Sequence, residues 1–198
     1  TRNSTPSKHS TASVIAIMRA EQDTPTQPPK LIAMAGLPGS GKSTIAEAFA
    51  HRLQIPIVSV DPIEAAMWRS GLSRNETGIA AYRVAQTIAA ENLKYGLSAI
   101  ADAVNPVEDA RQMWRETADA TGAQLIFLEV ICSDKATHKS RIESRTRGID
   151  GMPEVTWQRV EQRAAEYEAW TVSPLRIDTS NINIDEAVET AMNLVRRS

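Results

Sequence analysis

Apolar runs alternate with amphipathic stretches along the chain from Lys30 onward. A strand that is covered on both faces reads as a nearly continuous apolar run, whereas a surface helix repeats its apolar positions every three or four residues. The apolar runs predict five strands, at residues 31–35, 55–60, 97–104, 123–131 and 174–180.

The stretches between these runs predict helices, because they combine helical periodicity with polar, proline or glycine residues at their ends. Asp61 and Pro62 suit the N-cap and the first turn of one helix, and Gly71 suits its end. A loop is expected at 71–78. The expected helices cover residues 43–53, 61–71, 79–96, 105–122, 133–148, 155–170 and 184–197.

The alternation of strands and helices determines the expected architecture. Strands that are separated by helices pair in parallel, through right-handed crossovers. We therefore predict an α/β fold of three layers, in which helices cover both faces of a five-stranded parallel sheet.

Composition limits the classes of protein to consider. The 198 residues are 42% apolar and 23% charged, which suits one domain with an ordinary core. The net charge of −2 argues against a nucleic-acid partner. Cys132 is the single cysteine, so no internal disulfide can form, and we expect a reducing, cytoplasmic compartment. No apolar stretch is long enough to span a membrane.

Residues 1–29 differ in composition from the rest of the chain. They combine Ser- and Thr-rich stretches with a Pro/Gln linker, and the short apolar patch at 12–20 lacks a convincing cleavage site. We expect a flexible leader here and the folded domain at 30–198. Met18 is a candidate for the natural start of the protein.

The stretch GLPGSGKST, residues 36–44, carries the clearest chemical signal. It matches G-x-x-x-x-G-K-[ST] and lies between a predicted strand and a predicted helix, as a P-loop NTPase fold requires. Lys42 is expected to bridge the outer phosphates, the Ser43 hydroxyl to bind Mg²⁺, and Thr44 to contact the inner phosphate. The expected nucleotide-binding residues are Gly36, Gly39, Ser40, Gly41, Lys42, Ser43 and Thr44.

The chain lacks the motifs of several classes of P-loop protein, which limits the classes to consider. It has no N-K-x-D for guanine, no LSGGQ-like signature, and no apolar strand that ends in Asp-Glu. The kinase branch remains, in which ATP with Mg²⁺ is the donor.

Polar residues at strand ends are candidates for the chemistry, because ligands bind at the carboxyl edge of open α/β sheets. Asp61 ends the second strand, which we expect beside the phosphate loop, and could act as general base or hold Mg²⁺ through water. Asp102 ends the third strand, which we expect next to the first. It could be an outer-sphere Mg²⁺ ligand or an acceptor contact. Asn105 could contact the acceptor or cap the next helix.

Arginines in HKSRIESRTRG are candidates for a lid, which we place at about 134–155. Phosphoryl transfer needs positive charge over the γ-phosphoryl group, and a mobile segment can supply it. Arg141 and Arg145 are four residues apart and should share one helix face. Arg145 is the first candidate, Arg141 the second and Arg147 the third. The alternative is a solvated charged face.

Together, GLPGSGKST, the Asp after the second strand, DAVN and RIESR make residues 30–180 resemble the P-loop small-molecule kinases of the zeta-toxin, chloramphenicol-phosphotransferase and polynucleotide-kinase type. The resemblance implies that Asp61 is the general base and that Arg141 and Arg145 stabilise the transferred charge. It also implies that Asn105 faces the acceptor and that adenine lies near 179–181.

The acceptor site should be formed by residues 61–96, and the sequence leaves its occupant open. Arg69, with Arg74 and Arg83, could bind an anionic or sugar-like acceptor, and Trp68 and Tyr82 offer flat surfaces. Alternatively, the tryptophan packs in the core and the arginines are solvated.

Glu129 is unusual because it lies within an apolar strand. It is either a buried, paired carboxylate or a residue at a bulge or an edge.

The leading interpretation is an ATP- and Mg²⁺-dependent kinase that phosphorylates a hydroxyl of a small molecule. Its expected partners are ATP and that acceptor, with no membrane, and its expected state is monomer or homodimer. One alternative is a polynucleotide 5′-hydroxyl kinase, and another is an ATP-binding regulatory module with little turnover.

Overall fold

The computed structural model of the protein describes residues 27–198. Most of the predicted leader, including Met18, lies outside the described residues. The sheet has five strands: β1 (Lys30–Ala35), β2 (Ile57–Ser59), β3 (Ala99–Asp102), β4 (Gln124–Ile131) and β5 (Leu175–Asp178).

The strands are all parallel and lie in the order β2-β3-β1-β4-β5. This confirms the predicted fold class and the predicted place of β3 next to β1. The expectation that the strand before Asp61 also lies beside the phosphate loop is wrong, because β3 separates β2 from β1. In the register, Met34 of β1 is opposite Asp102 of β3, and Ala35 is opposite Glu129 of β4.

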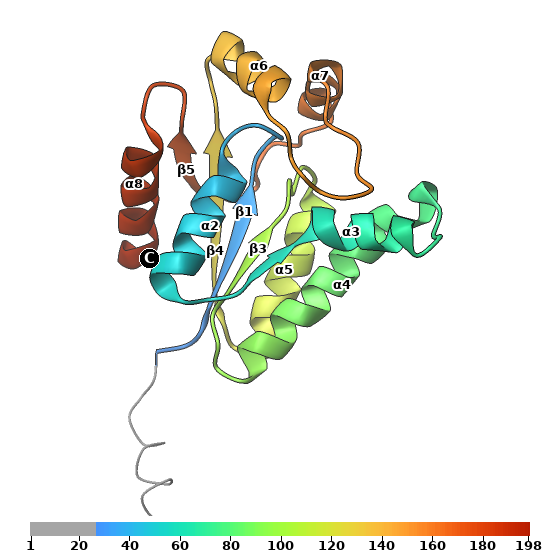
Figure 1. The fold of residues 1–198 in the computed structure, drawn as a ribbon. Helices are drawn as coiled ribbons and strands as arrows, with labels where there is room; N and C mark the ends of the chain where they lie inside the picture. The colour runs from blue at the N-terminus through green and yellow to red at the C-terminus, as the bar shows by residue number, and fades with distance from the viewer. Residues whose placement is uncertain (1–26) are drawn as a thin grey trace, which may run out of the picture.

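Helices cover both faces of the sheet, because alternate strand residues point to opposite sides (Figure 1). Ile32 and Met34 face a core that includes α2 and α8, whereas Leu31 and Ala33 face a core that includes α4 and α5. The helices of the described residues are α2 (Lys42–Leu53), α3 (Val60–Arg69), α4 (Arg74–Lys94), α5 (Glu108–Thr121), α6 (Lys135–Ser144), α7 (Trp157–Ala165) and α8 (Ile184–Arg197).

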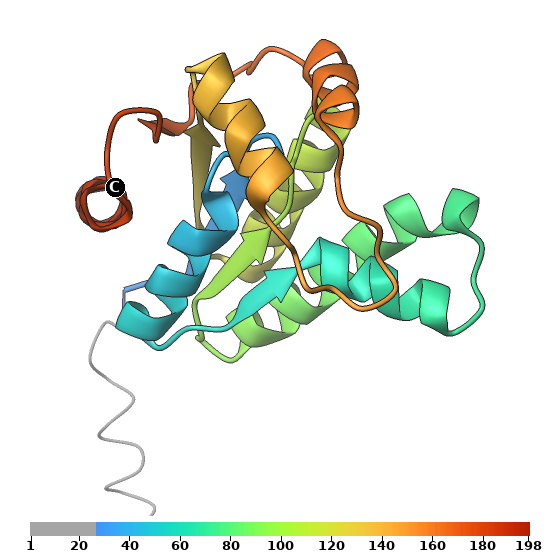
Figure 2. The ribbon, with the colours of Figure 1, turned by 45° about the horizontal axis from the view of Figure 1, so that its top comes forward.

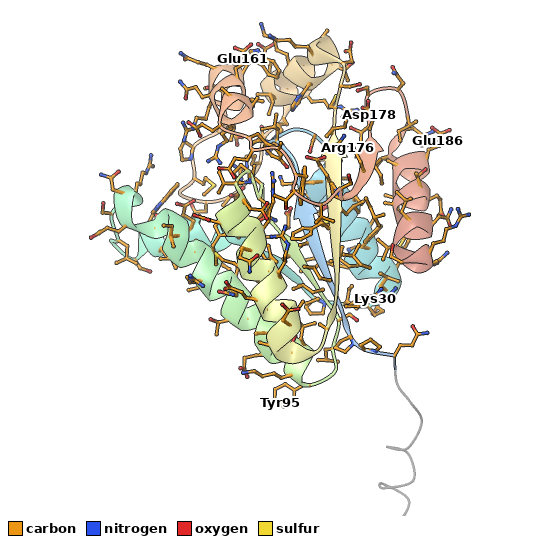
Figure 3. All side chains as sticks on the ribbon, turned by 180° about the vertical axis from the view of Figure 1, so that it is seen from behind. Lys30, Tyr95, Glu161, Arg176, Asp178 and Glu186 are labelled. Carbon is orange, nitrogen blue, oxygen red and sulfur yellow. The ribbon has the colours of Figure 1, made fainter. Side chains whose placement is uncertain are left out.

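The carboxyl ends of the strands mark one end of the molecule, and α6 and α7 lie beyond them (Figure 1). Glu161 and Asp178 lie at this end, and Lys30 and Tyr95 lie toward the opposite one (Figure 3). None of the described helices is both long and apolar enough to cross a bilayer.

Several predicted helix boundaries are wrong near the carboxyl edge of β2 and β3. Helix α3 begins at Val60 with Ser59 as its N-cap, so Asp61 lies in its first turn and is not the cap. The expected loop at 71–78 is mostly helix, because the Ser73 side chain accepts a hydrogen bond from the Asn75 N–H and so caps α4. The helix expected from Asn105 begins only at Glu108.

The lid region also has shorter helices than the sequence predicts. Helix α6 ends at Ser144, four residues before the expected end at 148, and α7 ends at Ala165, not at 170. The chain between the two helices, 145–156, has no regular secondary structure. The last helix, α8, matches its prediction and starts with a capping box between Asn183 and Glu186.

Glu129 is the buried, paired carboxylate of the first alternative. Only 4% of its surface is exposed, although it lies in the middle of β4. The Trp170 Nε1 donates to it at 2.8 Å, and the Arg176 Nε lies 2.6 Å from it. These contacts join β4 to β5 and to the chain after α7, and they satisfy a charge that would otherwise be costly to bury.

Candidate active site

Three glycines shape the loop between β1 and α2. Gly36, Gly39 and Gly41 have φ angles of 127°, 83° and 99°, a region that residues with a Cβ atom rarely adopt. Gly36 also passes so close to β4 that a Cβ atom there would lie 2.1 Å from the Val130 carbonyl oxygen. The loop conformation therefore depends on glycine for both its dihedral angles and its close packing.

We expect Gly36→Ala to lower the free energy of unfolding by at least about 2 kcal/mol, because the new methyl group meets a backbone atom that cannot move aside. The matched control is Gly78→Ala in α4, where nothing lies within 4 Å of the added carbon. That change should stabilise the protein by about 0.5–1 kcal/mol, since glycine weakens a helix interior. Urea unfolding measures both. Equal stability of the Gly36→Ala variant and the wild type would contradict the argument.

The end of this loop presents groups that fit phosphates. Helix α2 begins at Lys42 without a side-chain cap, so its first N–H groups are open to an anion at its positive end. The Ser40 hydroxyl is buried and has no hydrogen-bond partner within the described residues. Lys42 is 8% exposed, whereas Ser43 and Thr44 are exposed. A glycine cradle with an unsatisfied buried hydroxyl suits a nucleotide.

Helix α6 packs directly on the phosphate loop. The His138 Nε2 lies 2.8 Å from the Pro38 carbonyl oxygen, and Ile142, four residues on, is the side chain that an added Cβ on Gly39 would meet. Sequence reasoning missed His138. The available signal was its spacing from Ile142, which places both on one face of a helix next to the predicted lid arginines.

Arg141 and Thr179 connect the lid, the chain after β5 and the loop. Arg141 donates to the Thr179 hydroxyl at 2.7 Å and to its carbonyl oxygen at 2.8 Å. The same hydroxyl donates to the Ser40 carbonyl oxygen at 2.8 Å. Arg141 thus holds the end of the phosphate loop in place through Thr179.

A cavity of about 410 Å³ adjoins the phosphate loop. Thr179, within the stretch 179–181 that the resemblance implies for adenine, contributes to its wall together with the first residues of α8. The cavity lies between the loop, α6 and α8. Its lining includes Gly39, Gly41, Thr44, Arg141, Arg145, Thr179, Ile182 and Asn183.

Arg145 does not continue the helical face of Arg141, as the sequence predicts, because α6 ends at Ser144 and Arg145 has an extended backbone. Both arginines nevertheless line this cavity.

Burial and neighbouring charged groups both affect the pKa of Arg145. Burial, and after it the neighbouring charge of Arg147, lowers the pKa of Arg145 below its ordinary value. The carboxylates of Glu154, Asp61 and Asp102 act in the opposite direction. Arg145 therefore lies within electrostatic reach of both acids that the sequence places at the reaction centre.

Asp61 is bound by Arg147, the third of the lid candidates. The Arg147 guanidinium donates to Asp61 Oδ2, and no other group of the described residues forms a hydrogen bond or ion pair with this carboxylate. The Arg147 side chain is 10% exposed and that of Asp61 43%. The Asp61 carboxylate is thus partly exposed to solvent, and its ion pair with Arg147 fixes its position.

Asp102 at the end of β3 has the features of a ligand for a bound cation. Its Oδ2 lies 3.5 Å from the Ser59 hydroxyl, and its Oδ1 is buried without a partner among residues 27–198. Mg²⁺ keeps several waters and uses few protein groups together with phosphates. Asp102 and the exposed Ser43 hydroxyl fit such a site. The described residues contain no cluster of three or more His, Cys, Asp or Glu that could hold a metal by themselves.

A second and larger cavity, of about 630 Å³, begins at Asp61. Tyr82 lines it, and its hydroxyl oxygen accepts a hydrogen bond from the Asn105 N–H at 3.3 Å. Burial raises the pKa of Tyr82 to about 12, so the phenol keeps its proton. Elements α3, α4, α5 and α7 form the walls. The charged residues of the lining are Asp61, Glu64, Asp109, Glu116, Arg83 and Arg163.

The other two predicted acceptor contacts, Arg69 and Asn105, are not among the residues that line this cavity. Arg69 is exposed and binds Asp150 of the lid. Asn105 is fully buried, where its amide nitrogen donates to the Met34 carbonyl oxygen at 2.7 Å and its amide oxygen accepts from Trp114 at 2.9 Å. In this conformation Asn105 connects β1 to α5 at the carboxyl ends of the strands.

The two flat side chains considered for the acceptor site, Trp68 and Tyr82, lie in different places relative to the larger cavity. Trp68 is half-buried, donates to the Thr77 hydroxyl at 2.7 Å and lies under the Arg74 guanidinium, outside the cavity lining. Tyr82, by contrast, lines the cavity, as does the neighbouring Arg83.

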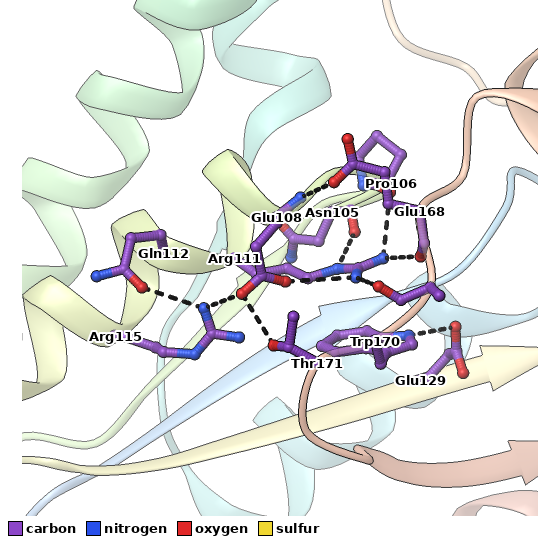
Figure 4. Close-up of polar contacts among 11 residues, drawn as sticks. Asn105, Pro106, Glu108, Arg111, Gln112, Arg115, Glu129, Glu168, Trp170 and Thr171 are labelled. Atoms are coloured by element: carbon purple, nitrogen blue, oxygen red, sulfur yellow. Dashed lines mark hydrogen bonds and ion pairs between the residues drawn. The ribbon is translucent and has the colours of Figure 1, made fainter.

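Arg111 of α5 fixes the loop that carries Asn105 (Figure 4). Its guanidinium is fully buried and joins this loop to the chain after α7. Cation–π contact adds to the hydrogen bonds, because the guanidinium carbon lies 3.9 Å from the Trp170 ring centroid. Its acceptors are the carbonyl oxygens of Asn105, Pro106, Glu168 and Ala169, at 3.1, 3.1, 2.9 and 3.0 Å.

A known protein family matches most of the chain. A family model described as an AAA domain matches residues 31–169. No curated protein matches the chain.

Solved kinase structures have the same fold. A candidate kinase of Chloroflexus aurantiacus has a TM-score of 0.67 at 22% identity, over 84% of this chain and 98% of its own. A sugar kinase of Janibacter gives 0.63 at 18%, over 86% and 95%. The Mycobacterium tuberculosis APS kinase, in complex with AMPPNP and APS, gives 0.61 at 18%, over 86% and 99%. The chain therefore has the P-loop fold of these kinases.

Proposed function

The chain belongs to the AAA domain family, and from that premise we propose that it is an ATP- and Mg²⁺-dependent kinase that phosphorylates a hydroxyl group of a small molecule. One observation carries the proposal. Asp61 opens onto a cavity of about 630 Å³ that is separate from the one beside the phosphate loop, of about 410 Å³. A site with a donor cavity, an acceptor cavity and a carboxylate at the second suits transfer between two substrates.

Each residue has a role that follows from its place. Lys42 and the N–H groups at the start of α2 would bind the ATP phosphates, and Arg145 and Arg141 would add positive charge from the lid. Ser43 and Asp102 would hold Mg²⁺, which supplies further charge neutralisation when it is bound.

The transfer step needs a base at the acceptor. The acceptor oxygen forms a bond to the γ-phosphorus, the bond from that phosphorus to the bridging oxygen breaks, and ADP leaves with the electron pair. The hydroxyl proton passes to Asp61. Positioning and charge stabilisation account for most of the catalysis in this class of reaction.

The charges of the larger cavity favour a small molecule over a polynucleotide. Its lining carries four carboxylates and two arginines, whereas a groove for a polyanion needs an excess of positive charge. The alcohol class of acceptor and the cytoplasmic location belong to this proposal and rest on the sequence. The expected state is monomer or homodimer, and the sequence does not decide between them.

A panel of hydroxyl acceptors with γ-labelled ATP tests the proposal. It should include sugars, nucleosides, amino alcohols, aminoglycoside-like compounds and a 5′-hydroxyl oligonucleotide. We expect label to be transferred to at least one of the small molecules. Transfer to the oligonucleotide alone would support a polynucleotide kinase. ATP binding without transfer to any acceptor would support a regulatory module.

A further inference from the structure

An irregular loop of the lid, residues 145–156, lies against α3 (Figure 2). Two contacts fasten it there. Arg147 pairs with Asp61 in the first turn of α3. At the other end of the helix, Arg69 donates to the Asp150 carbonyl oxygen, and its Nε lies 3.7 Å from the Asp150 carboxylate. The lid loop therefore contacts α3 at both ends of the helix.

The Arg147 contact differs from an ordinary surface ion pair, which contributes little. The arginine side chain is 10% exposed, and its backbone N–H donates to the Glu154 carboxylate at 2.9 Å. The loop thus holds its own arginine in position. The Arg69 pair is different, because both of its side chains are well exposed, at 45% and 90%.

The contact lies at the atom that the reaction needs. A general base must be within hydrogen-bond reach of the proton that it takes. Here Asp61 Oδ2 already accepts from a guanidinium, which fixes the carboxylate and has no proton acceptor of its own. Arg145 lines the donor cavity two residues earlier, whereas Arg147 does not. The two arginines therefore serve different sites.

We propose that Arg147 gates the base. While the acceptor cavity is empty, the guanidinium occupies Asp61 and keeps it from activating water, and an acceptor hydroxyl that enters the cavity replaces the guanidinium. The inference rests on the proposed function, because it requires Asp61 to be the base.

The gate would prevent one side reaction. In hydrolysis, a water oxygen bonds to the γ-phosphorus of ATP, the bond to the bridging oxygen breaks, ADP leaves, and the water proton passes to Asp61. Water is always present in an open cavity, so a kinase with an unoccupied base would consume ATP without phosphorylating an acceptor. A closed lid limits such reactions.

The test measures ATP hydrolysis by the full chain with Mg²⁺ and without any acceptor. We expect Arg147→Ala to raise its rate on the order of tenfold. This is less than the roughly 10²–10⁴-fold that a positioned base contributes, because a water in the cavity is not held in place as an acceptor is. Adding Asp61→Asn to this variant should return hydrolysis to the wild-type level, because the freed base is what acts on water. Arg147→Lys should give a smaller rise, because an ammonium lacks the planar guanidinium fork.

Arg159→Ala is the matched control. Within residues 27–198, the side chain of this exposed arginine of α7 forms a hydrogen bond only with Gln162. This substitution should leave hydrolysis unchanged. Thermal melting checks that the Arg147 variants fold. If Arg147→Ala does not fold, the hydrolysis rate of Arg147→Lys tests the gate.

Two results would overturn the gate: no rise in hydrolysis in either Arg147 variant, or a rise that survives Asp61→Asn. Neither depends on finding the acceptor. The acceptor panel can therefore succeed while the gate fails, and the two proposals are distinguishable.

Discussion

Asp61→Asn should reduce phosphoryl transfer by about 10²–10⁴-fold, the range that general-base catalysis contributes, while ATP affinity stays nearly unchanged. The reason is geometric. Asp61 lines the larger cavity and does not line the one beside the phosphate loop, so its loss should affect the acceptor half of the reaction. Single-turnover transfer to the acceptor that the panel identifies, together with calorimetric titration of a non-hydrolysable ATP analogue, measures the two effects separately.

The control for this change is Asp119→Asn, which removes the same charge at an exposed position of α5 outside the cavity lining. Asparagine also leaves Arg147 without its ion pair, so thermal melting should accompany the assay. Transfer that persists in the Asp61→Asn variant would show that another group is the base.

The sheet could be predicted from the sequence because its strands are encoded locally. The strand at Lys30–Ala35 is apolar at nearly every position and is buried on both faces, and the phosphate loop follows it directly. A strand, a glycine loop and a helix in succession leave little freedom for the backbone. The cavity beside the loop and the larger cavity at Asp61, by contrast, are formed by elements that are far apart in the sequence.

Contacts over long distances explain the boundaries that could not be predicted. Residues 74–78 look like a loop because of Gly78, yet Thr77 is buried and bonds to Glu64 and Trp68, which ties this turn to α3. Packing outweighs the low helix propensity of glycine here. Asn105 adopts a left-handed backbone, with φ of 49°, and its partners Met34 and Trp114 come from other elements.

The lid arginines show the same limit within the candidate site. A helical spacing favours Arg141 and Arg145 as a pair, but the helix ends at Ser144, and the extended chain after it carries Arg147 to Asp61. No local pattern indicates where a helix of charged residues stops when its propensities are nearly uniform. The partner of Arg147 lies 86 residues away in the sequence.

Lys42→Ala should weaken ATP binding and lower turnover together, by a factor on the order of 10²–10³ in kcat, as the loss of one preorganised hydrogen-bond donor does elsewhere. Within residues 27–198 no carboxylate lies within ion-pair distance of Lys42, although the residue is only 8% exposed, so its charge is available to a phosphate. Hydrolysis assays and titration with the ATP analogue measure both effects.

The matched control is Lys94→Ala at the end of α4, where an exposed lysine pairs with Glu91. It removes the same charge from the molecule and should change neither quantity, because α4 ends away from the carboxyl edge of the sheet. Nucleotide affinity should also distinguish the role of Lys42 from that of Asp61. Only the Lys42→Ala variant should lose affinity for the nucleotide, whereas both variants should lose turnover. Wild-type affinity and turnover in the Lys42→Ala variant would contradict the assignment of 36–44 as the phosphate-binding loop, and with it the kinase proposal.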